Sequence, residues 1–103
     1  MADTFEFRVS DSVTVPLRGR LLRLRVLSGT PRAADLAIGK KLRLRAPDGR
    51  ERIIPILDHS ITGGKLTQKR LDSTREVDVI VSGEDSVVDG DPIEIGWTAR
   101  GPE

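Results

Sequence analysis

The chain has 103 residues and no cysteine, which is enough for one domain and excludes disulfides and thiolate metal sites. Aromatic residues make up only 3% of it, so Val, Ile and Leu must build the core, and these side chains favour sheet over helix. No apolar run approaches the ~18 residues of a membrane helix, and residues 1–3 do not open a secretory signal. We therefore expect a single cytoplasmic domain over residues 1–103, with no membrane partner.

The net charge of +1 conceals an uneven distribution along the chain. Between Arg18 and Arg52 there are nine Arg and two Lys against three acidic residues, a surplus of eight positive charges. From Glu76 to the end there are eight acidic residues against one Arg, a deficit of seven. Either basic and acidic strands pair across a sheet, at ~0.2–1 kcal/mol per exposed pair, or the basic strands form a face for an anionic partner.

The first part of the chain predicts two strands and a corner. Residues 4–10 alternate apolar and polar side chains, which is typical of a half-buried strand, and residues 10–12 read as a turn. Pro16 cannot donate to a central ladder and Gly19 fits a bend or bulge, so the sheet turns a corner there. Residues 20–27 alternate again, with Leu and Arg sharing the outer face, so we expect a loop or a partner to cover part of it.

The middle of the chain predicts a hairpin. Residues 32–38 favour a short helical turn that is too short to matter for the core. Residues 41–45 and 51–57 read as two strands, joined by the Pro-Asp-Gly turn of residues 46–50. Pro55 places one side of the second strand at an edge.

The last part of the chain predicts a long polar loop and two strands. Residues 61–75 read as a mobile loop with a brief strand around Leu66. Residues 77–81 and 93–97 alternate as strands, and residues 98–103 read as a C-terminal tail. The pattern predicts an all-β fold, a small closed six-stranded antiparallel barrel with at most a short helical turn, since closure removes exposed edges.

Residues 11–29 resemble the translation-protein β-barrel, the second domain of elongation factor Tu-like translational GTPases. The shared features are an acidic turn, an Arg-Gly corner, an Arg-Val strand and a closing glycine, in ungapped order at Asp11, Arg18-Gly19, Arg25-Val26 and Gly29. Residues 38–42, 77–83 and 90–91 are similar to the family's step into its third strand, its penultimate strand and the turn that follows.

The resemblance implies that the chain is this barrel standing alone, since too few residues precede its first strand for a GTP-binding domain. In the family the barrel braces the nucleotide domain and, in elongation factor Tu, helps to hold the aminoacylated 3′ end of tRNA. The chain departs from the family in a longer loop at residues 30–38 and in Ser73-Thr74, where relatives have a small Ala-Gly pair.

The arginines supply the strongest candidate binding residues. Arg23 and Arg25 share one face of their strand, about 7 Å apart, and Arg43 and Arg45 do the same on theirs. If the two strands lie side by side, they form a grid of forked donors suited to phosphate oxygens. Residues that could widen this face are Arg18, Arg20, Lys65, Lys69 and Arg70.

No motif in the sequence predicts catalysis or a cofactor. Residues 63–67 lack the upstream Gly and the hydroxyl of a phosphate-binding loop, and the lone His59 has no partners that would converge on it. Residues 89–91 read as a turn, because the further oxygen ligands of a calcium loop are missing, and zinc has no adequate ligand set. We expect no catalytic residue, no cofactor, no metal and no small-molecule substrate.

Two hypotheses follow. In the first, the chain is a non-catalytic, translation-factor-like module that binds RNA, a tRNA acceptor end or ribosomal RNA, through its arginine face. In the second, it is a protein–protein interaction module that docks on a separate GTPase or another protein. Phe5, Phe7 and Trp97 fall on core faces, so general single-strand binding by base stacking is not expected. The sequence does not specify an oligomeric state.

Overall fold

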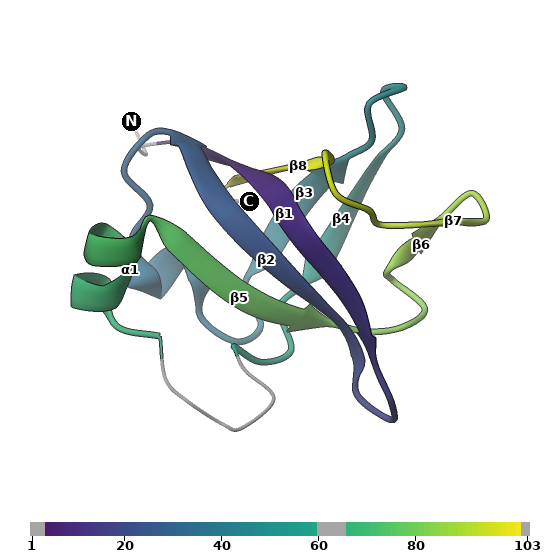
Figure 1. The fold of residues 1–103 in the computed structure, drawn as a ribbon, viewed down its shortest axis with the longest axis horizontal. Coiled ribbons are helices and arrows are strands. Elements are labelled where there is room, and N and C mark those ends of the chain that lie inside the picture. The colour runs from purple at the N-terminus through teal and green to yellow at the C-terminus, as the bar shows by residue number, and fades with distance from the viewer. Residues whose placement is uncertain (1–3, 60–65, 102–103) are drawn as a thin grey trace.

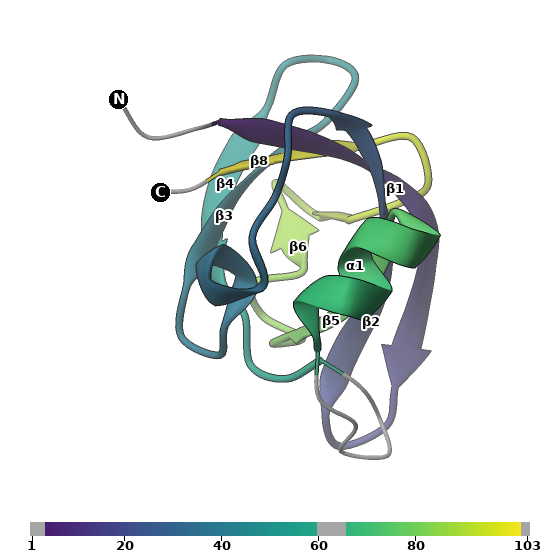
Figure 2. The ribbon, with the colours of Figure 1, turned by 90° about the vertical axis from the view of Figure 1, so that its left-hand side faces the viewer.

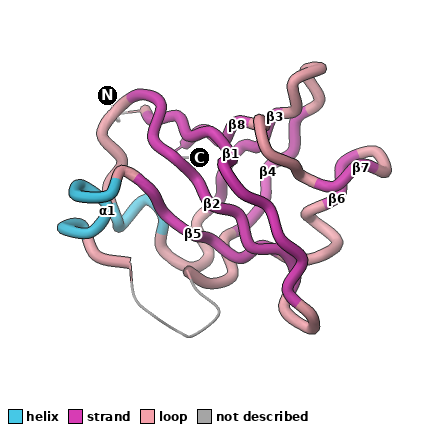
Figure 3. Tube along the Cα trace, viewed as in Figure 1, coloured by secondary structure: helices cyan, strands magenta, loops and turns pink. Residues whose placement is uncertain are grey.

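The computed structural model describes residues 4–59 and 66–101, and about half of them lie in β-strands (Figure 1). Six strands form one antiparallel sheet in the order β4-β3-β8-β1-β2-β5. Their bounds are β1 Phe5–Val15, β2 Gly19–Ser28, β3 Lys41–Arg45, β4 Glu51–Pro55, β5 Glu76–Val81 and β8 Thr98–Gly101. A separate hairpin pairs β6, Val87–Val88, with β7, Asp91–Pro92, and the helical elements are η1, Ala33–Leu36, and α1, Gln68–Thr74. Figure 3 shows both helical elements at one end of the strands.

The sheet curls into a half-barrel. In Figure 2, β3 and β4 lie on one side and β1 and β2 on the other, with α1 and η1 over the near end. The edge strands β4 and β5 do not pair with each other. The segment after β4 instead makes one isolated bridge to β5, in which Leu57 N donates to the Ile80 carbonyl and Ile80 N to the Asp58 carbonyl, both at 2.8 Å. The all-β, six-stranded antiparallel prediction is therefore confirmed, and the closed barrel is not.

Alternation of side chains decides which face of each strand is buried. Phe7, Val9, Leu22 and Leu24 are all 0% exposed, as predicted. The arginines that alternate with them on β2 are exposed. The core thus fills the concave side of the sheet, and guanidinium groups remain on the convex side.

The predicted turn at residues 10–12 is wrong, because β1 runs unbroken through them. The pairing of β1 with β2 shifts by one residue between Val9 and Asp11, which is a bulge rather than a turn. The predicted bend at Gly19 is confirmed: its φ is 122°, and a Cβ there would lie 2.0 Å from the Val81 carbonyl oxygen. Only glycine permits this close approach of β2 to β5.

The predicted last strand and tail are both wrong. Residues 93–97 form a loop in which Ile95 is 61% exposed and Gly96 has a φ of 98°. Thr98–Gly101, expected to be a tail, is β8, and it lies between β1 and β3 inside the sheet. Its only apolar side chain is Ala99, so periodicity gave no signal for a strand.

The predicted strand around Leu66 is also wrong. Leu66 is outside any strand, and the residues after it form α1, whose first turn is capped by Thr67 Oγ1 accepting from Arg70 N at 3.2 Å. Leu71 of α1 is 1% exposed and belongs to the core. The short helical turn at residues 32–38 is confirmed as η1, but it does matter for the core, because Leu36 is completely buried.

Candidate nucleic-acid interface

The two arginine-bearing strands are not neighbours. Strands β1 and β8 separate β2, which carries Arg23 and Arg25, from β3, which carries Arg43 and Arg45. The predicted grid on adjacent strands is therefore wrong. The cause is β8, because the residues expected to be a tail occupy the place beside β3.

Arg23 has acidic side chains beside it on both neighbouring strands. Its Nε is 3.0 Å from Asp78 Oδ1 on β5 and 3.9 Å from a Glu76 carboxylate oxygen, and Asp11 lies opposite it on β1. The hydrogen bond to Asp78 and the charge of that carboxylate raise the pKa of the Arg23 guanidinium. At this end of β2 the basic and acidic strands pair across the sheet, which was the first interpretation of the charge pattern.

A different arrangement lies at the other end of the sheet, on β3, β8, β1 and β2. Arg43 lies directly opposite Arg100 of β8. Arg8 of β1 lies directly opposite Arg25. Only the uncharged Thr98 separates Arg45 from Arg8 in the row across the strands. We call this set the arginine band; it consists of Arg8, Arg25, Arg43, Arg45 and Arg100.

Two members of the arginine band were missed by the sequence analysis. Arg100 was placed in a tail, so no pattern connected it to the sheet. Arg8 alternates with buried residues on β1 and could have been assigned to the outer face, but nothing in the sequence placed it opposite Arg25. Register between strands is set by tertiary packing, which one sequence does not state.

Acidic residues balance only part of the arginine band. Glu6 lies 3.3 Å from Arg100, and Glu51 lies 3.6 Å from Arg43. Arg25 Nη1 is 3.8 Å from Glu76. Such half-exposed pairs contribute about 0–1 kcal/mol each.

The two remaining members, Arg8 and Arg45, are exposed and make no ion pair with any described residue. Among the described residues, three carboxylates, those of Glu6, Glu51 and Glu76, pair with members of the arginine band, and Glu76 also lies 3.9 Å from Arg23.

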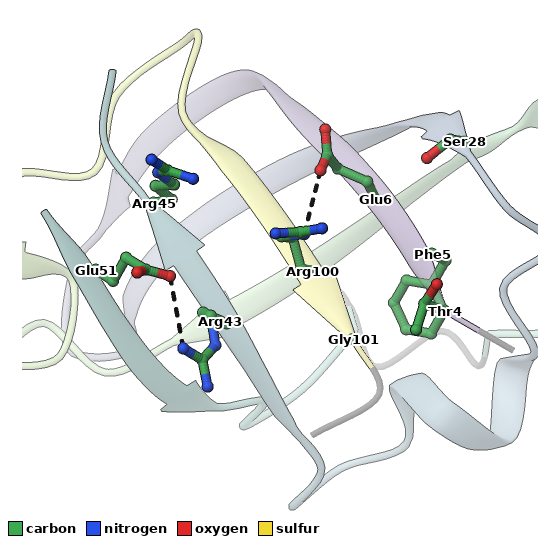
Figure 4. Close-up of a pocket in the computed structure, with 9 residues that line it drawn as sticks. All are labelled: Thr4, Phe5, Glu6, Ser28, Arg43, Arg45, Glu51, Arg100 and Gly101. Carbon is green, nitrogen blue, oxygen red and sulfur yellow. Dashed lines mark ion pairs between the residues drawn. The ribbon is translucent and has the colours of Figure 1, made fainter. Parts of the chain in front are cut away.

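The surface beside three members of the arginine band, Arg43, Arg45 and Arg100, is hollowed (Figure 4). One hollow, of about 380 Å³, is lined by Arg43, Arg45 and Arg100 together with Glu6 and Glu51. A second, of about 300 Å³, adjoins it and shares Glu6, Arg45 and Arg100. The guanidinium groups therefore border a recess that an anionic group can enter, rather than a flat wall.

The other predicted binding residues lie elsewhere. Arg18 pairs with Asp58 at 2.7 Å, and Arg20 donates to the hydroxyls of Ser12 and Thr14, both at 3.1 Å. Both arginines lie beside the β1–β2 turn, about 17 Å or more along the strands from Arg25. Lys69 and Arg70 are exposed on α1, which packs against β5 at the edge of the sheet remote from β3, and Lys65 lies outside the described residues.

Two further arginines have a structural role. Arg50 reaches Asp91 Oδ2 at 2.8 Å and the Val88 carbonyl at 3.1 Å, and Arg52 donates to the Val87 carbonyl at 2.7 Å. The hydrogen bonds from Arg50 also lower the pKa of the Asp48 carboxyl. These contacts fasten the β3–β4 hairpin to β6 and β7, so neither cation belongs to the candidate interface.

In the described part of the chain, the structure does not bring together the residues that were considered as candidate catalytic, phosphate-binding or metal-binding groups. His59 Nε2 contacts the Leu36 carbonyl oxygen, which ties the segment after β4 to η1. Asp89 and Gly90 have positive φ and form the turn between β6 and β7, and residues 63–65 of the Gly-Gly-Lys segment are not described. Residues 4–59 and 66–101 hold no group of three His, Cys, Asp or Glu side chains placed to bind a metal.

Comparison with family models and with curated proteins does not assign the chain to a family. No helix in the described ranges is long and apolar enough to cross a membrane. No family model matches the sequence, and no curated protein matches it significantly.

Proposed function

We propose that this chain is a non-catalytic RNA-binding module and that the arginine band is its contact surface. The observation that carries the proposal is that two pairs of like-charged residues lie directly opposite each other on neighbouring strands, Arg43 with Arg100 and Arg8 with Arg25. Like charges directly opposite each other destabilise a sheet. A phosphate placed between two such guanidinium groups replaces repulsion with charge-assisted hydrogen bonds, so an RNA backbone fits this surface.

The chemistry of the surface favours a folded RNA. Phe5, Phe7 and Trp97 are each no more than 4% exposed, so they offer no platform on which free bases could stack. Arginine forks beside a recess suit phosphates held in a fixed arrangement, as in a tRNA acceptor end or ribosomal RNA. We expect the module to meet such RNA in the cytoplasm.

We also propose that the fold belongs with the closed translation-protein barrels of elongation factor Tu-like GTPases. Three features support this: the antiparallel six-stranded sheet, the bend at Gly19, and the two hydrogen bonds that join residues 57–58 to Ile80 of β5. In a closed barrel these hydrogen bonds extend into a ladder between the two edge strands.

The test is a titration of fluorescently labelled acceptor-stem RNA, followed by anisotropy at several salt concentrations. Four phosphate contacts give a slope of log K against log salt of about −3, and each arginine removed from the arginine band reduces its magnitude by about one. We expect Arg8→Gln and Arg45→Gln to behave in this way.

Arg23→Gln is the matched control. Arg23 lies on the same convex surface and is also exposed, but it is held by Asp78. The control variant should bind as the wild type does. Absence of binding at low salt, or an equal loss in Arg23→Gln, would overturn the proposal.

A further inference from the structure

The turn between β1 and β2 contains a strained and fully exposed leucine. Arg18 N donates to the Val15 carbonyl at 3.0 Å, which closes a four-residue turn with Pro16 and Leu17 at its centre. Leu17 has a φ of 65°, in the left-handed region, and its exposure is 107%. After a proline, this position of a turn normally holds Gly or Asn, because a Cβ is unfavourable there.

Nothing inside the described molecule offsets this strain. The Leu17 side chain is fully solvated, so it contributes no burial, whereas glycine would adopt the same backbone conformation without the cost. A large apolar side chain held out on a strained turn gains free energy only when another molecule covers it.

The charges around the turn indicate what that molecule is. Residues 12–21, which form the arm on either side of Leu17, contain Arg18 and Arg20 and no acidic residue. Arg18 pairs with Asp58 from the segment after β4, while Arg20 contacts only hydroxyl groups within the described residues. An apolar tip on a basic arm is complementary to a polyanion.

The tip is narrow as well as apolar. The next exposed apolar side chain on the arm is Val13, which lies on β1 and is 48% exposed. An isolated Pro-Leu tip is small for the core of a protein–protein interface, which requires a larger central cluster. It does suit the apolar wedges, Leu and Pro among them, that nucleic-acid-binding proteins press against base pairs.

We propose that Leu17 stacks on the terminal base pair at the open end of an RNA duplex. This inference rests on the proposed function. Leu17 lies in the turn between β1 and β2, and Arg25 lies toward the far end of β2, about 25 Å away along the strand. One duplex that contacts the arginine band through its phosphates can therefore reach the tip with its end.

Two RNA probes of the same stem sequence test the inference. One has an open end with 2-aminopurine in its terminal pair, and the other has both ends closed by loops. We expect wild-type protein to prefer the open stem and to change the 2-aminopurine fluorescence. Leu17→Gly should bind the open stem about tenfold more weakly and lose both the preference and the fluorescence change, with an unaltered salt slope since no charge is removed.

Two further variants make the test specific. Leu17→Met keeps an apolar tip and should retain the preference for the open stem. Ile38→Ser removes an apolar side chain that is 62% exposed elsewhere on the surface, and it should bind as the wild type does. Leu17→Gly should fold, because glycine is favoured at this φ.

The possible outcomes separate the two proposals. If wild-type protein binds neither stem at low salt, both proposals fail. If it binds the two stems equally, or if Leu17→Gly keeps the preference, RNA binding stands and the stacking of Leu17 is overturned. A loss in Leu17→Gly that Ile38→Ser reproduces also overturns it.

Discussion

Arg23 and Arg25 are two residues apart on the same convex face of β2, yet their surroundings differ. Arg23 has Asp78 and Glu76 beside it on β5, with Asp11 opposite on β1. Arg25 has Arg8 opposite it and only a 3.8 Å contact to Glu76. The comparison shows that two exposed arginines on the same face of one strand acquire different surroundings from the strands that flank them.

The largest effect should come from reversing the charges of Arg8 and Arg45, which make no ion pair with any described residue. We expect the double variant Arg8→Glu, Arg45→Glu to bind acceptor-stem RNA about a hundred-fold more weakly at low salt. Arg8→Glu removes the like charge opposite Arg25, whereas Arg45→Glu places one opposite Glu51, so the opposing effects should leave the thermal unfolding midpoint little changed. Anisotropy and thermal unfolding of the same samples would check this, and a large loss of stability would instead give these residues a structural role.

The second prediction concerns β8, the strand that places Arg100 opposite Arg43. A Cβ on Gly101 of β8 would lie 2.7 Å from Cζ of Phe5, a residue that is 3% exposed. We expect Gly101→Ala to lower the free energy of unfolding by about 1–3 kcal/mol through overpacking. Gly83→Ala is the control, because its Cβ would meet nothing within 4 Å. Equal stability of both variants in denaturant titrations would contradict this packing.

A smaller effect is expected at Arg23, because removing its partner carboxylate should give this arginine surroundings more like those of Arg25. In Asp78→Asn, Arg23 loses its main partner and becomes available to phosphate. We expect RNA affinity to rise a few-fold while stability falls by about 0.2–1 kcal/mol, the usual contribution of an exposed pair. Asp85→Asn breaks a comparable 3.4 Å pair with Arg52 away from the arginine band, and it should leave RNA affinity unchanged.

The smallest effect concerns repulsion within the arginine band. Arg8→Gln removes the like charge opposite Arg25, so we expect the free energy of unfolding to rise by about 0.2–0.5 kcal/mol at low salt. The gain should vanish at high salt, where exposed charges are screened. Arg23→Gln should do the reverse. Urea titrations at two salt concentrations would detect a change of opposite sign, and matching signs would count against like-charge strain.

The sequence predicted the strands whose alternation is strong. Phe5, Phe7 and Val9 of β1 and Leu22 and Leu24 of β2 are buried as expected, because each run places several large apolar residues on one face. Strand β8 and helix α1 were missed because each carries one buried apolar side chain, Ala99 and Leu71, too few to define a period.

The candidate site was predictable only in part. Alternation was enough to place Arg23, Arg25 and Arg45 on an exposed face. The order of the strands decides which arginines meet, and it depends on long-range pairing that local pattern does not encode. That is why Arg100 was absent from the predicted face, and why Arg23 was included although Asp78 occupies it.

The position of β8 has a consequence for how the chain folds. Phe5 pairs with Gly101, and among the described strands β8 joins β1, β2 and β5 to the β3–β4 hairpin. Contacts between such distant parts of a chain form slowly, since a long loop must close before they bring any gain. We therefore expect the β1–β2 and β3–β4 hairpins to form early from their local turns, and the addition of β5 and β8 to limit the rate.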